Sequence, residues 1–219
     1  MRIILSLITS LLLANSSLAQ AGHAKLRPSS DYWDRDAKHI PVKISRVSQD
    51  RKLATVGDTL YMLDGRNQVV WTWSACGPPL TDLPVIDSKG TIYVIGYDLL
   101  WAALDSATGK MKWQGTANGK AVYSQIELYR GDMYLVVTDM GGYRANAYPG
   151  EVIKDNLTLC RGNSILWVTE IPAGARVQVR GDKVFVVTKR KNRTVRREVA
   201  IPRHFDRPIG KVSALADYE

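Results

Sequence analysis

The sequence contains few of the side chains on which most enzyme active sites depend. Only three histidines occur among its 219 residues, and His23, His39 and His204 all lie outside the repeated part of the chain. Histidine is the usual proton shuttle of general acid–base catalysis. A nucleophile-elbow serine motif, an H-E-x-x-H zinc motif and a phosphate-binding loop are also missing. We therefore predict that the protein is not an enzyme, and an active site built from scattered residues is the remaining alternative.

Cysteine is equally scarce. Cys76 and Cys160 are the only two, they lie 84 residues apart, and neither belongs to a C-x-x-C pair. This spacing argues against a redox or zinc site. Two cysteines of an exported protein can form one disulfide, whereas two separate, partly buried thiols need no partner. The residues leave both alternatives open.

Long apolar runs are absent except at the start of the chain. Residues 1–19 contain Arg2, the run IILSLITSLLLA, and the small residues Ser17 and Ala19 at the positions that precede a cleavage site. The run is shorter than the roughly 20 residues of a membrane-spanning helix. We predict that residues 1–19 are a signal peptide and that the protein is periplasmic or secreted and does not span a membrane. The alternative is an N-terminal anchor that is retained.

Acidic residues are outnumbered, since 30 Lys and Arg face 21 Asp and Glu, for a net charge of +9. Much of the excess lies in residues 188–199, TKRKNRTVRREV. A basic stretch favours anionic partners, and the predicted export makes nucleic acid the least favoured of them. The alternative is a solvated hairpin that its charge keeps soluble. The candidate contacts to an anion or a partner are Lys189, Arg190, Lys191, Arg193, Arg196 and Arg197.

Helical periodicity is missing from residues 20–219, and short β-forming runs replace it. Residues 41–73 and 84–113 share one order of features: a short strand, a turn, a second strand, a third strand that ends in Leu-Asp, another turn and a tryptophan. The two Leu-Asp pairs lie 41 residues apart and the two tryptophans 42 residues apart. This regular spacing indicates an internal repeat.

Two further units follow the same order more loosely. In the third, we expect residues 143–152 to form the third strand and an inserted loop between Gly150 and Asn163 to carry Cys160. The fourth unit begins near residue 175 and reaches no clear tryptophan. A period of about 40 residues with four strands is typical of a β-propeller blade.

The repeat predicts an all-β fold of about three and a half to four four-stranded antiparallel blades. The propeller-like repeat domain covers residues 41–202, between an N-terminal extension at residues 20–40 and a C-terminal tail at residues 203–219.

Residues 103–113, ALDSATGKMKW, resemble the tryptophan-docking motif of quinoprotein-type β-propellers. That family includes pyrroloquinoline-quinone dehydrogenases and cofactor-free members such as the periplasmic propeller of outer-membrane barrel assembly. Its enzymes hold the quinone with two adjacent cysteines, which this chain lacks. The resemblance therefore implies the non-enzymatic branch, with no cofactor and no metal. The residues that it implies in docking one blade on the next are Trp71, Trp113, Trp167, Asp64, Asp105, Thr108 and Gly109.

The number of units leaves three arrangements open. The chain closes a four-bladed ring, with residues 31–40 or 211–219 as a missing outer strand, or forms an open arc, or pairs with a second chain in a larger ring. An open blade edge can also accept a strand from a partner. We predict an exported, non-catalytic scaffold that binds a protein or cell-envelope component or self-associates through open blade edges. The alternative is a module that binds a small ligand or glycan through aromatic loops.

Overall fold

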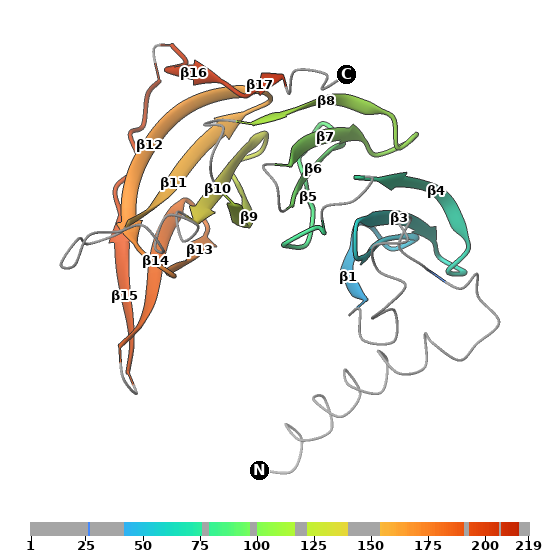
Figure 1. Cartoon of the computed structure of the whole chain (residues 1–219), viewed down its shortest axis with the longest axis horizontal. Helices are drawn as coiled ribbons and strands as arrows, with labels where there is room; N and C mark the ends of the chain where they lie inside the picture. The colour runs from blue at the N-terminus through green and yellow to red at the C-terminus, as the bar shows by residue number, and fades with distance from the viewer. Residues whose placement is uncertain are drawn as a thin grey trace.

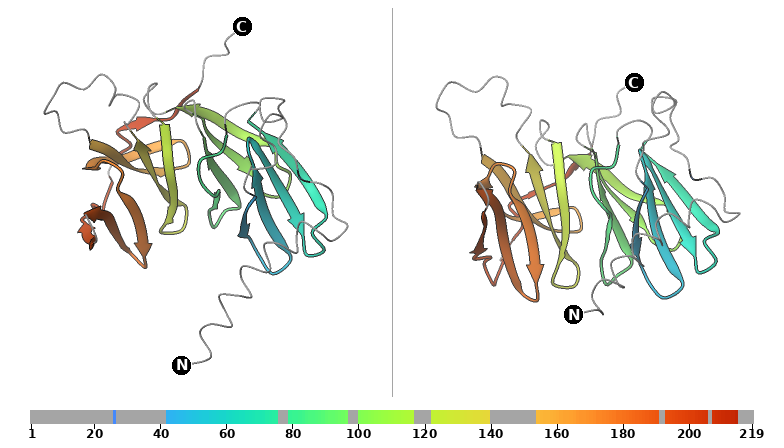
Figure 2. Two further views of the ribbon diagram at one scale, coloured as in Figure 1. Left: turned by 60° about the horizontal axis from the view of Figure 1, so that its bottom comes forward. Right: turned by 90° about the horizontal axis from the view of Figure 1, so that it is seen from below.

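The computed structural model describes residues 26, 42–75, 79–96, 100–116, 122–139, 154–190, 193–205 and 207–214. These residues form strands, turns and loops, and none of them is helical. The strands make four antiparallel sheets that fan out around an arc (Figures 1 and 2). The predicted all-β, propeller-like fold of about four blades is therefore confirmed.

The first two blades each contribute four strands in chain order. The first blade contains β1 (Lys43–Arg46), β2 (Arg51–Val56), β3 (Thr59–Asp64) and β4 (Val69–Ser74). The second contains β5 (Val85–Ile86), β6 (Thr91–Ile95), β7 (Trp101–Asp105) and β8 (Met111–Thr116). Every residue of β6 is buried because this blade is packed between two neighbours.

The third blade again has four strands in chain order, whereas the described residues give the fourth blade three. The third contains β9 (Val122–Tyr129), β10 (Met133–Asp139), β11 (Lys154–Arg161) and β12 (Ser164–Pro172). The fourth contains β13 (Arg176–Arg180), β14 (Lys183–Arg190) and β15 (Arg193–Val199). Six of the seven residues of β15 are exposed, in contrast to the buried β6.

The third strand of the third unit differs from our expectation. The expected strand at residues 143–152 lies outside the described residues, and much of the segment expected as an inserted loop forms β11. Leu157 and Leu159 of β11 are buried against the fourth blade, whereas Cys160 faces the second blade. Burial on both faces is what fixes this segment as a central strand.

The apolar core is divided into three clusters, one at each junction between consecutive blades. Leu53, Met62 and Leu104 belong to the cluster between the first and second blades. The other two clusters join the second blade to the third and the third to the fourth. Within the described residues, no core cluster joins the fourth blade to the first. The described part of the propeller is thus an arc with two ends.

The C-terminal residues cross two blades instead of completing the fourth. β16 (Gly210–Lys211) pairs with β12, and β17 (Ser213–Ala214) pairs with β8. Between them Val212 is buried in the cluster that joins the second and third blades. We call residues 209–214 the C-terminal strap. It covers the ends of two outer strands, so the described part of the tail supplies outer strands to the second and third blades and none to the fourth.

Candidate functional site

The turn after β7 is held by the carboxylate of Asp105. This carboxylate accepts hydrogen bonds from the Thr108 hydroxyl (2.9 Å) and from the backbone amides of Thr108 (2.9 Å) and Ala107 (3.1 Å). The Thr108 hydroxyl is the main reason why the pKa of Asp105 lies below its usual value. Gly109 closes the turn with a φ of 70°, which favours glycine.

Trp71 of the first blade packs on this turn of the second blade. Its indole Nε1 donates a hydrogen bond to the carbonyl of Ser106 at 3.1 Å. A Cβ atom at Gly109 would lie only 2.7 Å from Trp71 Cδ2 and Cε3. The ring therefore lies directly over the glycine. This contact joins the two blades at the residues that the resemblance implied.

The other two repeat tryptophans lie at the next two junctions. The Trp113 ring centroid is 6.3 Å from those of both Tyr93 and Trp101, in the cluster between the second and third blades. Trp167 is half-buried against the cluster between the third and fourth blades. In the first blade, Asp64 accepts hydrogen bonds at 2.8 Å from the amides of residues 66 and 68.

Cys160 is a free and fully buried thiol in the second of the core clusters. Its burial raises the pKa of the thiol, which opposes thiolate reactivity. Cys76 lies outside the described residues. The two alternatives for the pair therefore stay predictions, because one of its two cysteines is not described.

The basic residues of the fourth blade lie on or beside an exposed hairpin. The side chains of Lys189, Arg193, Arg196 and Arg197 are exposed. Arg190 lies in β14, and Lys191 lies outside the described residues.

A polar pocket of about 480 Å³ lies at the inner side of the arc, among the first strands of the blades. Three of its polar side chains form hydrogen bonds between segments of different blades. Lys43 Nζ donates to the carbonyl of Thr81 (2.9 Å), Asp82 accepts from the amide of Ile126 (3.1 Å), and Gln125 exchanges two hydrogen bonds with the backbone of Val177 (2.7 and 2.8 Å). We therefore interpret the inner pocket as a place where hydrogen bonds join adjacent blades.

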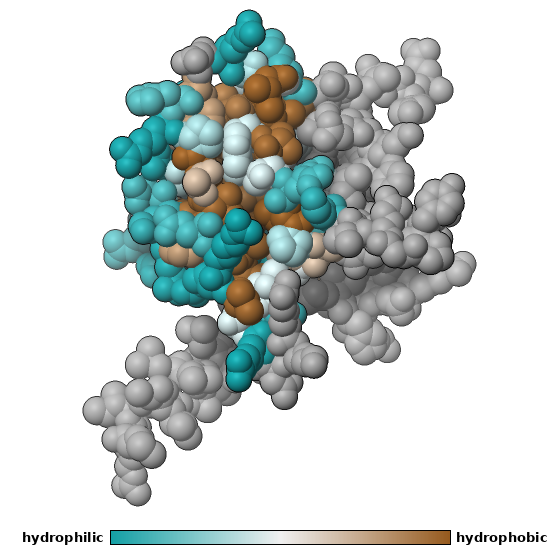
Figure 3. Space-filling view, turned by 90° about the vertical axis from the view of Figure 1, so that its left-hand side faces the viewer, coloured by the Kyte–Doolittle hydropathy of each residue, from teal (hydrophilic) through white to brown (hydrophobic). Residues whose placement is uncertain are grey.

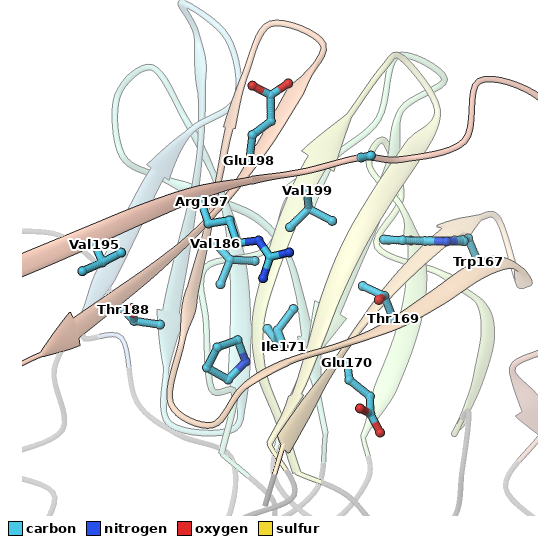
Figure 4. A pocket seen from close by; sticks show the side chains of 12 residues that line it. Trp167, Thr169, Glu170, Ile171, Val186, Thr188, Val195, Arg197, Glu198 and Val199 are labelled. Atoms are coloured by element: carbon cyan, nitrogen blue, oxygen red, sulfur yellow. The ribbon is translucent and has the colours of Figure 1, made fainter. Parts of the chain in front are cut away.

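A second groove, of about 540 Å³, opens between the third and fourth blades. Its walls come from β12, β14 and β15, and Figure 4 shows the guanidinium of Arg197 pointing into the space between them. On the same side of the molecule, Figure 3 shows apolar side chains bordered by hydrophilic ones. The lining residues with apolar or aromatic side chains are Trp167, Ile171, Pro172, Val186, Val195, Val199 and Ala200.

The groove lies beside the outer edge of the fourth blade, where the described residues supply no fourth strand. In the third blade, β12 is the outer strand and carries Trp167, whereas the described sheet of the fourth blade ends at β15. The edge of β15 that does not face β14 has no strand beside it among the described residues. A groove lined by apolar side chains next to an open sheet edge is a recognised way to bind an extended peptide.

Sequence reasoning found Trp167 and Arg197 but not the groove that they share. Ile171, Val186 and Val199 are ordinary strand residues in the sequence, and the groove forms only where two blades meet. The available signal was the fourth unit, which ends without a tryptophan and its strand.

The described residues offer no group of three or more His, Cys, Asp or Glu side chains placed to hold a metal ion. In the same part of the chain, no helix is long and apolar enough to cross a membrane.

Comparison with known proteins finds only weak similarity, and it is to solved β-propellers. No protein-family model and no curated protein sequence matches it. Among solved structures, the WD40 β-propeller domain of Doa1 is 16% identical with a TM-score of 0.46, over 67% of this chain and 46% of that chain. BamB from Moraxella catarrhalis is 13% identical with a TM-score of 0.39, over 66% of this chain and 54% of that chain. The chain thus spans about half the length of these propellers, and the quinoprotein-type resemblance stays a prediction.

Proposed function

We propose that this protein is a non-catalytic β-propeller scaffold that binds a protein partner through the groove between its third and fourth blades. The observation that carries the proposal is the three-stranded fourth blade, whose open β15 edge borders the groove. In this proposal an extended segment of the partner pairs with β15 and becomes the missing fourth strand. Main-chain hydrogen bonds then supply affinity, and alternate side chains of the segment enter the groove.

The side chains of β15 define which segments fit. Val195, Arg197 and Val199 line the groove, so the incoming strand requires apolar residues opposite the valines and an acidic residue opposite Arg197. Basic side chains on an edge strand also discourage pairing with unrelated strands. The edge is therefore selective for an acidic–apolar partner segment.

The amino-terminal sequence supports a location for this scaffold. Residues 1–19 have the charge, the apolar run and the small residues of a signal peptide. We therefore propose that the partner is an exported protein or a protein component of the cell envelope.

A site-specific photocrosslinker tests the groove directly. Val195 is 45% exposed and lines the groove, whereas Met111 is 53% exposed on β8 of the second blade. In the native host, a photoreactive residue at position 195 is expected to form a defined protein adduct that position 111 does not form. Arg197→Glu is expected to suppress the adduct at position 195, and Lys110→Glu, on an exposed turn, is the matched control. Equal adducts at both positions, or none at position 195, would refute the proposal.

A further inference from the structure

The side of the fourth blade turned away from the third blade is a cationic sheet face. Val177, Val184 and Val186 point into the core, so the residues that alternate with them along β13 and β14 project from the opposite side. Cross-strand pairing extends this face to Arg196 of β15, which is aligned with Val187. We call this surface the basic face. Its charged members are Arg176, Arg180, Lys183, Lys189, Arg196 and Glu198. Arg176, at the start of β13, also borders the inner pocket, and Glu198 also borders the groove.

Little of this positive charge is neutralised within the chain. Residues 175–200 contain nine Lys and Arg against two acidic residues, Asp182 and Glu198. Glu198 pairs with Lys183 at 3.2 Å, and Asp182 pairs with Arg130 at 3.5 Å. In the described part of the chain, no salt bridge involves the other four cations of the basic face.

The basic face also lies at one end of the arc. No core cluster of the described residues joins it to the first blade. Beyond the pairing of Arg176 with Val187, β14 and β15 continue as a two-stranded ribbon that projects past β13 (Figure 1). Lys189 and Arg193 lie on this ribbon. An approaching flat surface therefore meets the ribbon and the basic face before the other blades.

We propose that the basic face and its ribbon bind the anionic phospholipid headgroups of a bilayer. The cations are distributed over three strands of a sheet, which suits many phosphates spread over a plane rather than one anion in a cavity. Lys189 and Arg193 project from opposite sides of the ribbon, so a ribbon that enters a headgroup layer meets phosphates with both. Each basic residue near an anionic bilayer contributes about 1 kcal/mol, which is about a fivefold change in binding.

This binding is independent of the proposed protein partner. Val195, Arg197 and Val199 face the groove, whereas Arg176, Arg180 and Lys189 project from the opposite side of the same sheet. A membrane and a partner strand therefore occupy different faces of the fourth blade. Failure of one proposal leaves the other in place.

Vesicle co-sedimentation tests the inference with residues 20–219. The probes are vesicles of phosphatidylcholine alone and of phosphatidylcholine mixed with phosphatidylglycerol. We expect binding only to the anionic vesicles, weakened by salt because the charges are exposed. Arg176→Gln, Arg180→Gln and Lys189→Gln combined are expected to lower the partition coefficient about 100-fold. The matched control removes three exposed cations of the first two blades: Arg51, Arg66 and Lys110, each replaced by Gln.

Three results would overturn the inference. Equal binding to neutral and anionic vesicles would remove the role of headgroup charge, and an equal loss in the control variant would remove the role of the fourth blade. Tighter binding to a duplex DNA oligonucleotide than to the anionic vesicles would make nucleic acid the ligand. Circular dichroism and thermal melting of both variants separate a loss of binding from a loss of folding.

Discussion

Position 109 shows how one residue decides whether two blades dock. A methyl group there meets the Trp71 ring at 2.7 Å and sits on a backbone with a φ of 70°. We expect Gly109→Ala to destabilise the protein by about 3 kcal/mol, because a left-handed conformation costs about 1–2 kcal/mol and the clash adds to it. Gly181→Ala is the matched control, since its φ is 61° and nothing lies within 4 Å of the new methyl. Urea unfolding that gives equal losses for both variants would contradict a close packing of Trp71 on Gly109.

The Thr108 hydroxyl controls how Asp105 responds to acid. Because the folded pKa of Asp105 lies below its unfolded value of about 3.9, its stabilisation is present above about pH 4 and is lost as the pH falls through the folded pKa. We expect Thr108→Val to raise the pKa of Asp105 toward its unfolded value and Thr108→Ser, which retains a hydroxyl, to leave it low. NMR titration of the Asp105 carboxyl measures both. The same midpoint in the Val and Ser variants would show that the hydroxyl is not the cause.

At the scale of elements, the C-terminal strap fastens two blades that are already joined by a core cluster. Val212 is 7% exposed, and its amide donates a hydrogen bond to the carbonyl of Asn163 at 2.8 Å. We expect Val212→Asp to cost about 3 kcal/mol or more, because it places a charge in an apolar cluster, and to release the strap. Val212→Ala, which keeps the site apolar, is expected to cost less and to leave the strap in place. Limited proteolysis at residues 209–214 separates the two, and equal cleavage rates would contradict the role of Val212.

The elements that could be predicted from the sequence are those that local chemistry determines. The Leu-Asp pair, the turn after it and the tryptophan recur at a fixed spacing in the first two blades, because in both an Asp carboxylate accepts hydrogen bonds from the backbone amides of that turn. The third strand of the third unit was missed because β11 lacks the Leu-Asp ending of its counterparts. The strap was missed because β16 and β17 have two residues each, and they are strands only because β12 and β8 present free edges beside them.

At the scale of the whole molecule, closure depends on the angles between blades and cannot be read from one repeat. The packing of side chains in all three core clusters sets those angles, so small differences in each cluster add up around the arc. The groove between the third and fourth blades has the same origin, since its lining residues come from strands of two blades. Composition predicted the charge of the fourth blade, but the strand register was needed to show which cations share a face.

The charges at the two ends of the arc argue against a ring made from two chains. Such a ring places the basic face of one chain against the outer side of the first blade of the other. That outer side carries Arg46 and Lys52, which are aligned with each other and point away from the second blade. Like charges therefore meet at both junctions of the ring and oppose its closure.

We accordingly expect light scattering to give the mass of one chain at low salt, where unscreened charges repel most strongly. Arg176→Glu, Arg180→Glu and Lys189→Glu combined are expected to promote a dimer, because the reversed face then attracts Arg46 and Lys52 of a second copy. Adding Arg46→Glu and Lys52→Glu to that variant restores the repulsion and is expected to return it to a monomer. A stable wild-type dimer at low salt would contradict this account, since two arcs would then close a ring despite the repulsion between their ends.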